Sequence, residues 1–338
     1  MSLKQLWNDA RHPPANPTDL SFKGKTVLVT GANTGLGYQA ALKYSALGAD
    51  RLILGVRSRE KGEAAKSRIT RETHRNPDSI DVMTVDLSTF SSVVEFVERL
   101  GDEVPKLHVA LLCAGVAKPT FVRGPEGHEL STQVNVLSTA LMALLLLPRL
   151  RETAAADEDL THLSFVNSQS SHLVKPEQLP KKGETLIQRL DDSAQFDSTT
   201  QYFLVKLAAW FVMRGIAERS GQESRSRNGG AGAETSGVAI NASCPGMCRT
   251  DQGRDFPLGV RIFMGGFQAV FARSAEEGSR TLVSATGLGL ESTGKFWVND
   301  AYYEQNDLLK SERSEELYRE TWDEVLAILR ENVTSESV

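Results

Sequence analysis

The stretch between residues 25 and 48 constrains the fold of this 338-residue chain more than any other. Residues 25–30 (KTVLVT) form a β-branched run typical of a buried strand. The run leads directly into a glycine-rich turn at 31–37 (GANTGLG) and then into a helical pattern that Gly48 closes. Glycines let the backbone bend and approach a ligand, while free amides and the helix dipole hold negative charge. We therefore predict a phosphate cradle of the dinucleotide-binding type, with contacts from Gly31, Asn33, Thr34, Gly35, Leu36 and Gly37.

Strands and helices alternate along the rest of the chain. Further strands are expected at 51–56, 81–85, 107–112, 160–166, 238–242 and 293–298, and helices at 58–73, 88–100, 127–150 and 315–330. This alternation is typical of an α/β fold in which right-handed crossovers place the ligand crevice at the carboxyl edge of the sheet. We predict a Rossmann-type, doubly wound parallel sheet of about seven strands with helices on both faces.

The chain is expected to form one domain. We predict a polar, proline-containing leader at 1–22, a single dinucleotide-binding domain at 23–300, and a closing helix and tail at 301–338. Within the domain, the polar segment 174–200 is expected to be a loop with one short helix, and the low-complexity segment 220–237 a flexible surface loop.

The end of the second strand indicates which dinucleotide the cradle selects. An acidic residue about 20 residues beyond the glycines would bond the ribose hydroxyls of NAD. Here this position holds Arg57, which suits a 2′-phosphate and hence NADP(H). Arg59 either assists it or caps an exposed helix start.

Tyr202 and Lys206 are four residues apart, so on a helix they lie on the same face. A tyrosine alone is a poor acid or base at neutral pH because its unperturbed pKa is about 10. A neighbouring ammonium favours the phenolate and lowers that pKa. The pair is therefore a candidate proton-transfer device.

With these residues in place, the chain resembles the short-chain dehydrogenase/reductase family over residues 23–298. The retinol-dehydrogenase-like branch with its fungal secondary-metabolism members is the most similar, judging from residues 30–37, 57–65 and 202–208. The resemblance implies that Tyr202 is the general acid/base, and that Lys206 lowers its pKa and binds the nicotinamide ribose. It also implies that Asn135 helps to hold a proton-relay water.

The resemblance assigns two further sets of residues. A serine after the fifth strand polarises the substrate carbonyl, and alignment gives this role to Ser168, with Ser170 as the alternative. The remaining cofactor contacts that it implies are Asp86, Leu87, Ala114, Gly115, Asn135, Tyr202, Lys206, Pro245, Gly246 and Thr250.

The chain departs from the family pattern at two places. It has Leu112 and Cys113 before Ala114-Gly115, where the family usually carries asparagine. The interval between Ser168 and Tyr202 is long, 202 − 168 = 34 residues, so 174–200 is interpreted as an insertion. Such an insertion is either a lid over the substrate entrance or a neutral surface loop.

Composition excludes several other classes of protein. A net charge of −5 without a basic tract argues against a nucleic-acid surface. The apolar run 136–147 stops at Pro148 and is too short for a membrane span, so we interpret it as a core helix. Three cysteines without metal-type spacing, Cys113, Cys244 and Cys248, are expected to be reduced thiols, and no secretory signal pattern is present. We therefore expect a cytoplasmic protein that binds neither metal nor nucleic acid.

These features predict an NADP(H)-dependent oxidoreductase that acts on a small carbonyl or alcohol substrate, with ketone reduction in a secondary-metabolite pathway as the expected reaction. Two alternatives remain: a non-catalytic NADP-binding scaffold or sensor, and an epimerase or dehydratase. The spacing of Gly31, Gly35 and Gly37 disfavours the epimerase group, which usually has Gly-x-x-Gly-x-x-Gly. A homodimer is possible through the apolar helix 136–147 and the helix that carries Tyr202.

Overall fold

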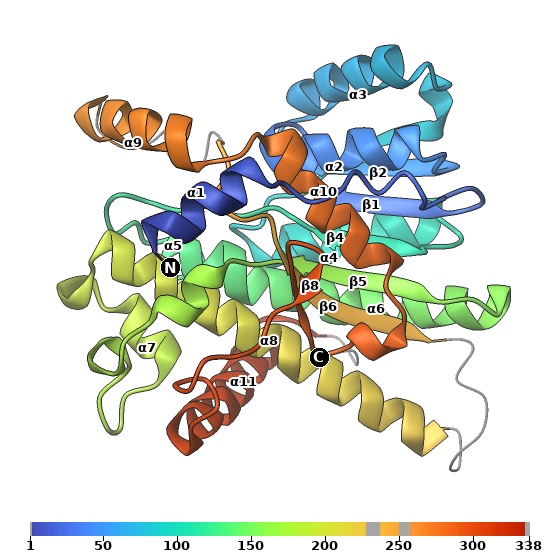
Figure 1. The fold of residues 1–338 in the computed structure, drawn as a ribbon. Coiled ribbons are helices and arrows are strands. Elements are labelled where there is room, and N and C mark those ends of the chain that lie inside the picture. The colour runs from blue at the N-terminus through green and yellow to red at the C-terminus, as the bar shows by residue number, and fades with distance from the viewer. Residues whose placement is uncertain (1, 228–236, 250–255, 257, 335–338) are drawn as a thin grey trace.

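The computed structural model describes residues 2–227, 237–249, 256 and 258–334. Its centre is one sheet in the order β3-β2-β1-β4-β5-β6-β7-β8 (Figure 1). The strands are β1 Thr26–Thr30, β2 Arg51–Val56, β3 Ile80–Thr84, β4 Val109–Leu112, β5 Thr161–Val166, β6 Val238–Cys244, β7 Phe296–Val298 and β8 Ala301–Tyr302. All neighbouring pairs are parallel except β7 with β8. The predicted doubly wound α/β fold is therefore confirmed.

The sheet has eight strands, not the expected seven or so, because the chain turns back after β7. Asn299 and Asp300 both adopt positive φ angles, 50° and 57°. Two successive residues of this kind form the tight turn that matches the twist of an antiparallel hairpin. The two-residue strand β8 pairs with β7 through this turn.

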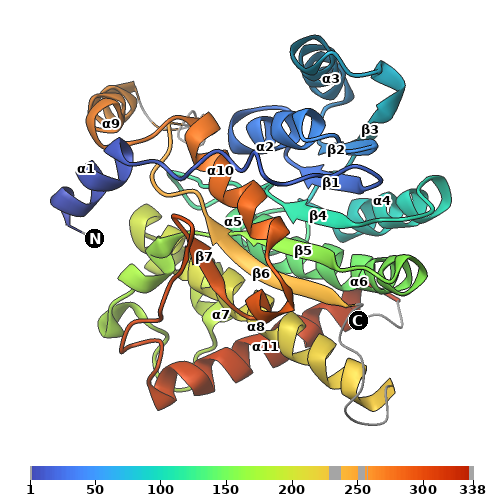
Figure 2. The same ribbon diagram turned by 45° about the vertical axis from the view of Figure 1, so that its right-hand side comes forward.

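Helices cover both faces of the sheet (Figure 2). They are α1 Leu3–Arg11, α2 Gly35–Ala46, α3 Arg59–Thr73, α4 Phe90–Glu103, α5 Leu130–Thr132, α6 Ser138–Asp157, α7 Leu186–Asp191, α8 Ser198–Arg227, α9 Leu258–Phe271, α10 Ala275–Ser284 and α11 Glu312–Asn332, with a π-helix at Gln133–Leu137. Strand side chains alternate between the two layers. Leu28 packs with α4, α6, α8 and α11, whereas Val27 and Val29 pack with α2, α3 and α10.

Two helices are longer than the sequence patterns suggest. The helix expected at 127–150 continues to Asp157, because Leu150 and Ala154 are buried against the core. Residues 220–227, expected to be part of a flexible loop, are the last two turns of α8. There Glu223 pairs with Arg219 at 3.0 Å. The rest of that predicted loop, 228–236, lies outside the described residues.

One helical stretch among the described residues, Leu130–Asp157, is long and apolar enough to cross a membrane. However, 83% of its apolar window is buried inside the protein. This burial agrees with our interpretation of the stretch as a core helix.

The segment 174–200 contains α7 and two short 3-10 helices, Pro176–Gln178 and Ser193–Gln195. Leu186, Ile187 and Leu190 of α7 are buried in the layer that contains α8 and α11. The insertion is therefore anchored to the body of the protein through an apolar face.

The contact between α8 and α11 generates a stability prediction. A methyl group at Gly215 would overlap the ring of Trp322, whereas one at Gly221, in the same helix, would meet nothing within 4 Å. We expect Gly215→Ala to lower the free energy of unfolding by about 1–3 kcal/mol through overpacking. Gly221→Ala is the matched control and should raise it by up to about 1 kcal/mol, because alanine favours the helix. Urea unfolding followed by circular dichroism measures both, and equal effects would show that the two helices do not pack as described.

Candidate active site

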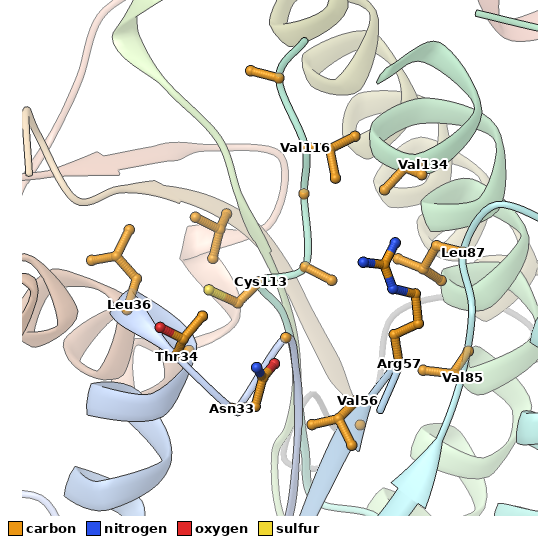
Figure 3. Close-up of a pocket in the computed structure, with 18 of the residues that line it drawn as sticks. Asn33, Thr34, Leu36, Val56, Arg57, Val85, Leu87, Cys113, Val116 and Val134 are labelled. Atoms are coloured by element: carbon orange, nitrogen blue, oxygen red, sulfur yellow. The ribbon is translucent and has the colours of Figure 1, made fainter. Parts of the chain in front are cut away.

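A cleft of about 360 Å³ opens at the carboxyl edge of the sheet, where the strand order reverses between β1 and β4. Such a switch point is where doubly wound sheets bind ligands. Figure 3 shows side chains from several strands converging on the cleft. The predicted site residues that line it are Gly31, Asn33, Thr34, Gly35, Leu36, Gly37, Arg57, Asp86, Leu87, Ala114, Gly115, Ser168, Tyr202, Lys206, Pro245 and Gly246.

Two of the predicted site residues that the structure describes do not line the cleft. Asn135 and Ser170 are buried behind its wall. Thr250 lies outside the described residues. The insertion 174–200, described throughout, contributes no lining residue, so in this conformation it does not act as a lid.

The glycine turn brings bare backbone to the floor of the cleft. Gly31 and Gly35 have positive φ angles of 69° and 57°, which side chains disfavour. A Cβ atom at Gly31 would lie 3.0 Å from the Cα atom of Ala114, and one at Gly37 would collide with the carbonyl of Gly31. Because α2 begins at Gly35 without a side-chain cap from Thr34, its first amides are available to an anion.

A cationic rim lies at the end of β2. Arg57 is exposed and lines the cleft together with Leu87, toward which its side chain extends in Figure 3. Ser58 and Lys61 line the cleft beside it, and the Ser58 hydroxyl accepts a hydrogen bond from the Lys61 amide at 3.3 Å. Arg59 is not part of the lining and pairs with Glu63 at 3.8 Å. This geometry favours the alternative in which Arg59 belongs to an exposed helix start.

Ser58 and Lys61 are cleft residues that our sequence analysis missed. A signal for them was present, because the N-cap of a helix and its first turn face the same ligand space as the strand end before them.

At the departure from the family pattern, the backbone amides of Cys113 and Ala114 are both paired. The hydroxyl of Thr30 accepts hydrogen bonds from the amides of Cys113 and Ala114, at 2.9 and 3.0 Å. These bonds fix the segment after β4 to the end of β1. The asparagine usual in the family is thus not needed to hold this connection.

Asn135 lies in the π-helix and holds the opposite side of the same segment. Its amide nitrogen donates to the carbonyls of Val116 and Ser131, both at 2.8 Å, and its oxygen accepts from the Val116 amide at 3.0 Å. A Cβ atom at Gly115 would lie only 2.6 Å from that oxygen. Asn135 therefore acts on the cleft by positioning the backbone of its wall.

A second, small cavity lies beside this asparagine. Its volume is about 10 Å³, and its lining includes Asn135, Thr139, Asn167 and Lys206. Such a volume is at the lower limit for one water molecule, and the polar groups around it provide hydrogen-bonding partners.

Tyr202 and Lys206 lie one turn apart on α8. They line the same cleft as Ser168, which follows the end of β5. Burial raises the pKa of Tyr202, and the neighbouring hydroxyl of Ser168 opposes this shift. Burial lowers the pKa of Lys206, whose ammonium donates to the Val166 carbonyl at 3.2 Å. The arrangement can deliver a proton from a phenol to an oxygen held beside Ser168.

Comparison of the two serines favours Ser168 as the group that faces a ligand. Ser168 lines the cleft, and its hydroxyl also accepts the Ser170 amide at 3.2 Å. The Ser170 hydroxyl is buried and has no hydrogen-bond partner among the described residues.

Fold and site together define a class of protein: a doubly wound dinucleotide-binding enzyme with a serine, a tyrosine and a lysine at the inner end of its cleft. The family model described as "short chain dehydrogenase" matches residues 25–157. This chain belongs to the short-chain dehydrogenase/reductase family, whose members are oxidoreductases that act on CH–OH or C=O groups with nicotinamide cofactors.

Particular relatives support this assignment over nearly the whole chain. The short-chain dehydrogenase/reductase ffsI of Aspergillus flavipes is 40% identical, covering 96% of this chain and 91% of that protein. The short-chain dehydrogenase/reductase phmF of Phaeosphaeria nodorum is 39% identical, covering 95% and 91%. Among solved structures, a short-chain dehydrogenase from Shigella flexneri complexed with NADP superposes with a TM-score of 0.58 at 21% identity, covering 83% of this chain and 98% of that one.

The two cysteines that line the cleft provide a test of its burial. Burial raises the pKa of Cys113 and that of Cys248 to about 12. Because only the thiolate is nucleophilic, alkylation at pH 8 should be on the order of a thousandfold slower than for a free cysteine. The rate should rise about tenfold per pH unit up to the highest pH at which the protein stays folded. Iodoacetamide labelling followed by peptide mass spectrometry measures this, with urea-unfolded protein as the control, and a plateau near pH 9 would contradict such burial.

Proposed function

We propose that this protein is an NADP(H)-dependent reductase that converts a ketone to a secondary alcohol. The observation that carries the proposal is the composition of one cleft, with a cationic rim of Arg57 and Lys61 at one end and Tyr202, Lys206 and Ser168 at the other. These two groups of side chains match the two ends of NADP(H). The cations suit its 2′-phosphate, and the proton donor must lie near its nicotinamide ring.

The residues present fit NADP(H). The glycine turn leaves no room for side chains where a pyrophosphate would approach the backbone, and the start of α2 supplies amides. Arg57 and Lys61 supply cations at the position expected for the 2′-phosphate. The bound cofactor supplies hydride, and the NADP complex of the structural relative from Shigella flexneri supports the same choice of nucleotide.

The chain's own groups provide the proton and the orientation. Ser168 donates a hydrogen bond to the substrate oxygen, and Tyr202 delivers a proton to it as negative charge develops. Lys206 would hold the ribose of the bound cofactor and would stabilise the phenolate that remains on Tyr202. The small cavity beside Asn135 and Lys206 would hold one water, from which Lys206 would pass a proton back toward Tyr202.

Reduction is the expected direction because cells keep their NADPH pool reduced. The resemblance to fungal members of the family supports a role in secondary metabolism, with a cytoplasmic location. A non-catalytic NADP-binding scaffold would explain the cleft but not the convergence of Ser168, Tyr202 and Lys206. The glycine spacing supports a reductase more strongly than an epimerase or dehydratase.

The acid/base role of Tyr202 is tested by Tyr202→Phe. Without its hydroxyl, NADPH oxidation in the presence of a panel of ketones should fall about a thousandfold. Binding of NADPH, followed by nicotinamide fluorescence, should be retained because the ring remains. Tyr302→Phe is the control, since the Tyr302 hydroxyl bonds only to Glu291 on the surface, at 3.3 Å. Loss of binding in Tyr202→Phe would show that the residue is structural.

The choice of nucleotide is tested by Arg57→Asp. We expect NADPH binding to weaken by about 10–100-fold, as for the loss of a charge-assisted contact, and NADH binding to strengthen. Arg59→Asp introduces the same charge two residues away, outside the cleft, and should leave the preference unchanged. Titrations with both nucleotides measure this. If Arg57→Asp leaves the preference unchanged, Arg57 does not bind the 2′-phosphate. If neither NADPH nor NADH binds the wild type, the whole proposal is wrong.

A further inference from the structure

Two helices lie side by side at the carboxyl edge of the sheet, outside the layers that cover its faces. Figures 1 and 2 both show α1 and α9 together at this end of the molecule. The chain reaches α9 soon after Pro245, Gly246 and Cys248, which line the cleft. The two helices therefore stand at the end of the protein where the cleft opens.

This pair of helices carries most of the exposed apolar surface. Ten large hydrophobic side chains are exposed among the described residues, and seven of them belong to α1 and α9. They are Leu3, Trp7, Leu258, Val260, Ile262, Met264 and Val270. Leu258 and Ile262 are each 68% exposed and lie one turn apart. A concentration of exposed apolar side chains of this kind marks an interaction site.

The apolar surface is built on a fixed platform. The ring of Trp7 packs edge-on against Phe271 with 6.3 Å between the centroids, and Phe271 packs against Phe267 at 4.7 Å. The buried guanidinium of Arg273 donates to the Asp9 carbonyl at 2.7 Å. These contacts join α1 to α9 while leaving their outer side chains in solvent.

The charges on the two helices are mostly basic, although the chain as a whole has a net charge of −5. Lys4, Arg11 and Arg261 are exposed, and so is Arg249, whose amide bonds to the Arg273 carbonyl. Asp9 is the only acidic residue in either helix. Exposed apolar side chains together with exposed cations complement a lipid surface with anionic headgroups.

We propose that α1 and α9 form a docking surface for an anionic lipid bilayer. The two helices lie in the plane of the interface, with Leu258 and Ile262 inserted among the acyl chains, and Lys4, Arg11 and Arg261 against the phosphates. Trp7 lies at headgroup depth, a position that suits its amphipathic ring. The cleft then opens close to the membrane. The inference concerns where the protein binds and does not depend on the reaction it catalyses.

Flotation of the full-length protein with lipid vesicles tests the proposal. Wild type should float with vesicles of phosphatidylcholine and phosphatidylglycerol, and less with phosphatidylcholine alone. Leu258→Asp/Ile262→Asp should reduce the bound fraction by about tenfold or more, because two charges then face the acyl chains. Ala155→Asp/Ala156→Asp is the matched control, since it puts the same charges on two exposed apolar residues at the far end of α6. It should float like wild type.

Fluorescence quenching provides a second, independent measurement. Brominated lipids should quench a component of the tryptophan emission of wild type that is absent in Trp7→Phe, a variant that keeps an apolar ring and should still float. The proposal is overturned if wild type stays unbound to the anionic vesicles or if the Asp variant floats equally well. Light scattering that shows a dimer of wild type and a monomer of the Asp variant, without lipid binding, would assign the surface to a second copy of the chain.

Discussion

The cleft depends on a close approach of backbone to backbone between the end of β1 and the segment after β4. Gly31 lies against Ala114 with no room for a side chain, and Thr30 holds the amides of Cys113 and Ala114. From the other side, Asn135 holds Val116 through both of its amide atoms. These contacts fix the backbone of the cleft before a ligand arrives. Binding therefore costs the protein little conformational entropy at this point.

A buried carboxylate connects this wall to the helix that carries Tyr202 and Lys206. Glu129 is fully buried and accepts hydrogen bonds from the amides of Ser131 and Thr132, at 2.9 and 3.1 Å, and from the Gln201 side chain at 3.1 Å. A buried charge is tolerated only where such donors surround it. The bonds of Glu129 therefore set the start of α8 relative to the π-helix of Asn135, and with it the position of Tyr202 beside the cleft wall.

The sequence patterns were sufficient for the order of the elements and for most of the cleft, because both follow from local rules. A glycine turn between a strand and a helix has few possible structures, and parallel strands bring their carboxyl ends to one edge. The features that could not be predicted are set by tertiary contacts. Packing of Leu150 and Ala154 carries α6 beyond its expected end at residue 150, and the Asn299-Asp300 turn allows β8 to pair with β7. The bonds of Asn135 to Val116 join positions 19 residues apart in sequence.

The proton-transfer residues show how the protein environment and a ligand act together. Burial favours the uncharged form of both groups, because it raises the pKa of Tyr202 and lowers that of Lys206. Without a ligand, the pair therefore resists the separation of charge that acid/base catalysis requires. The Ser168 hydroxyl already opposes the shift at Tyr202. A negatively charged ligand in the cleft would favour the ammonium of Lys206, and this ammonium in turn would favour the phenolate. Proton transfer is in this way coupled to occupation of the cleft, which limits the chemistry to the state in which a substrate can be reduced.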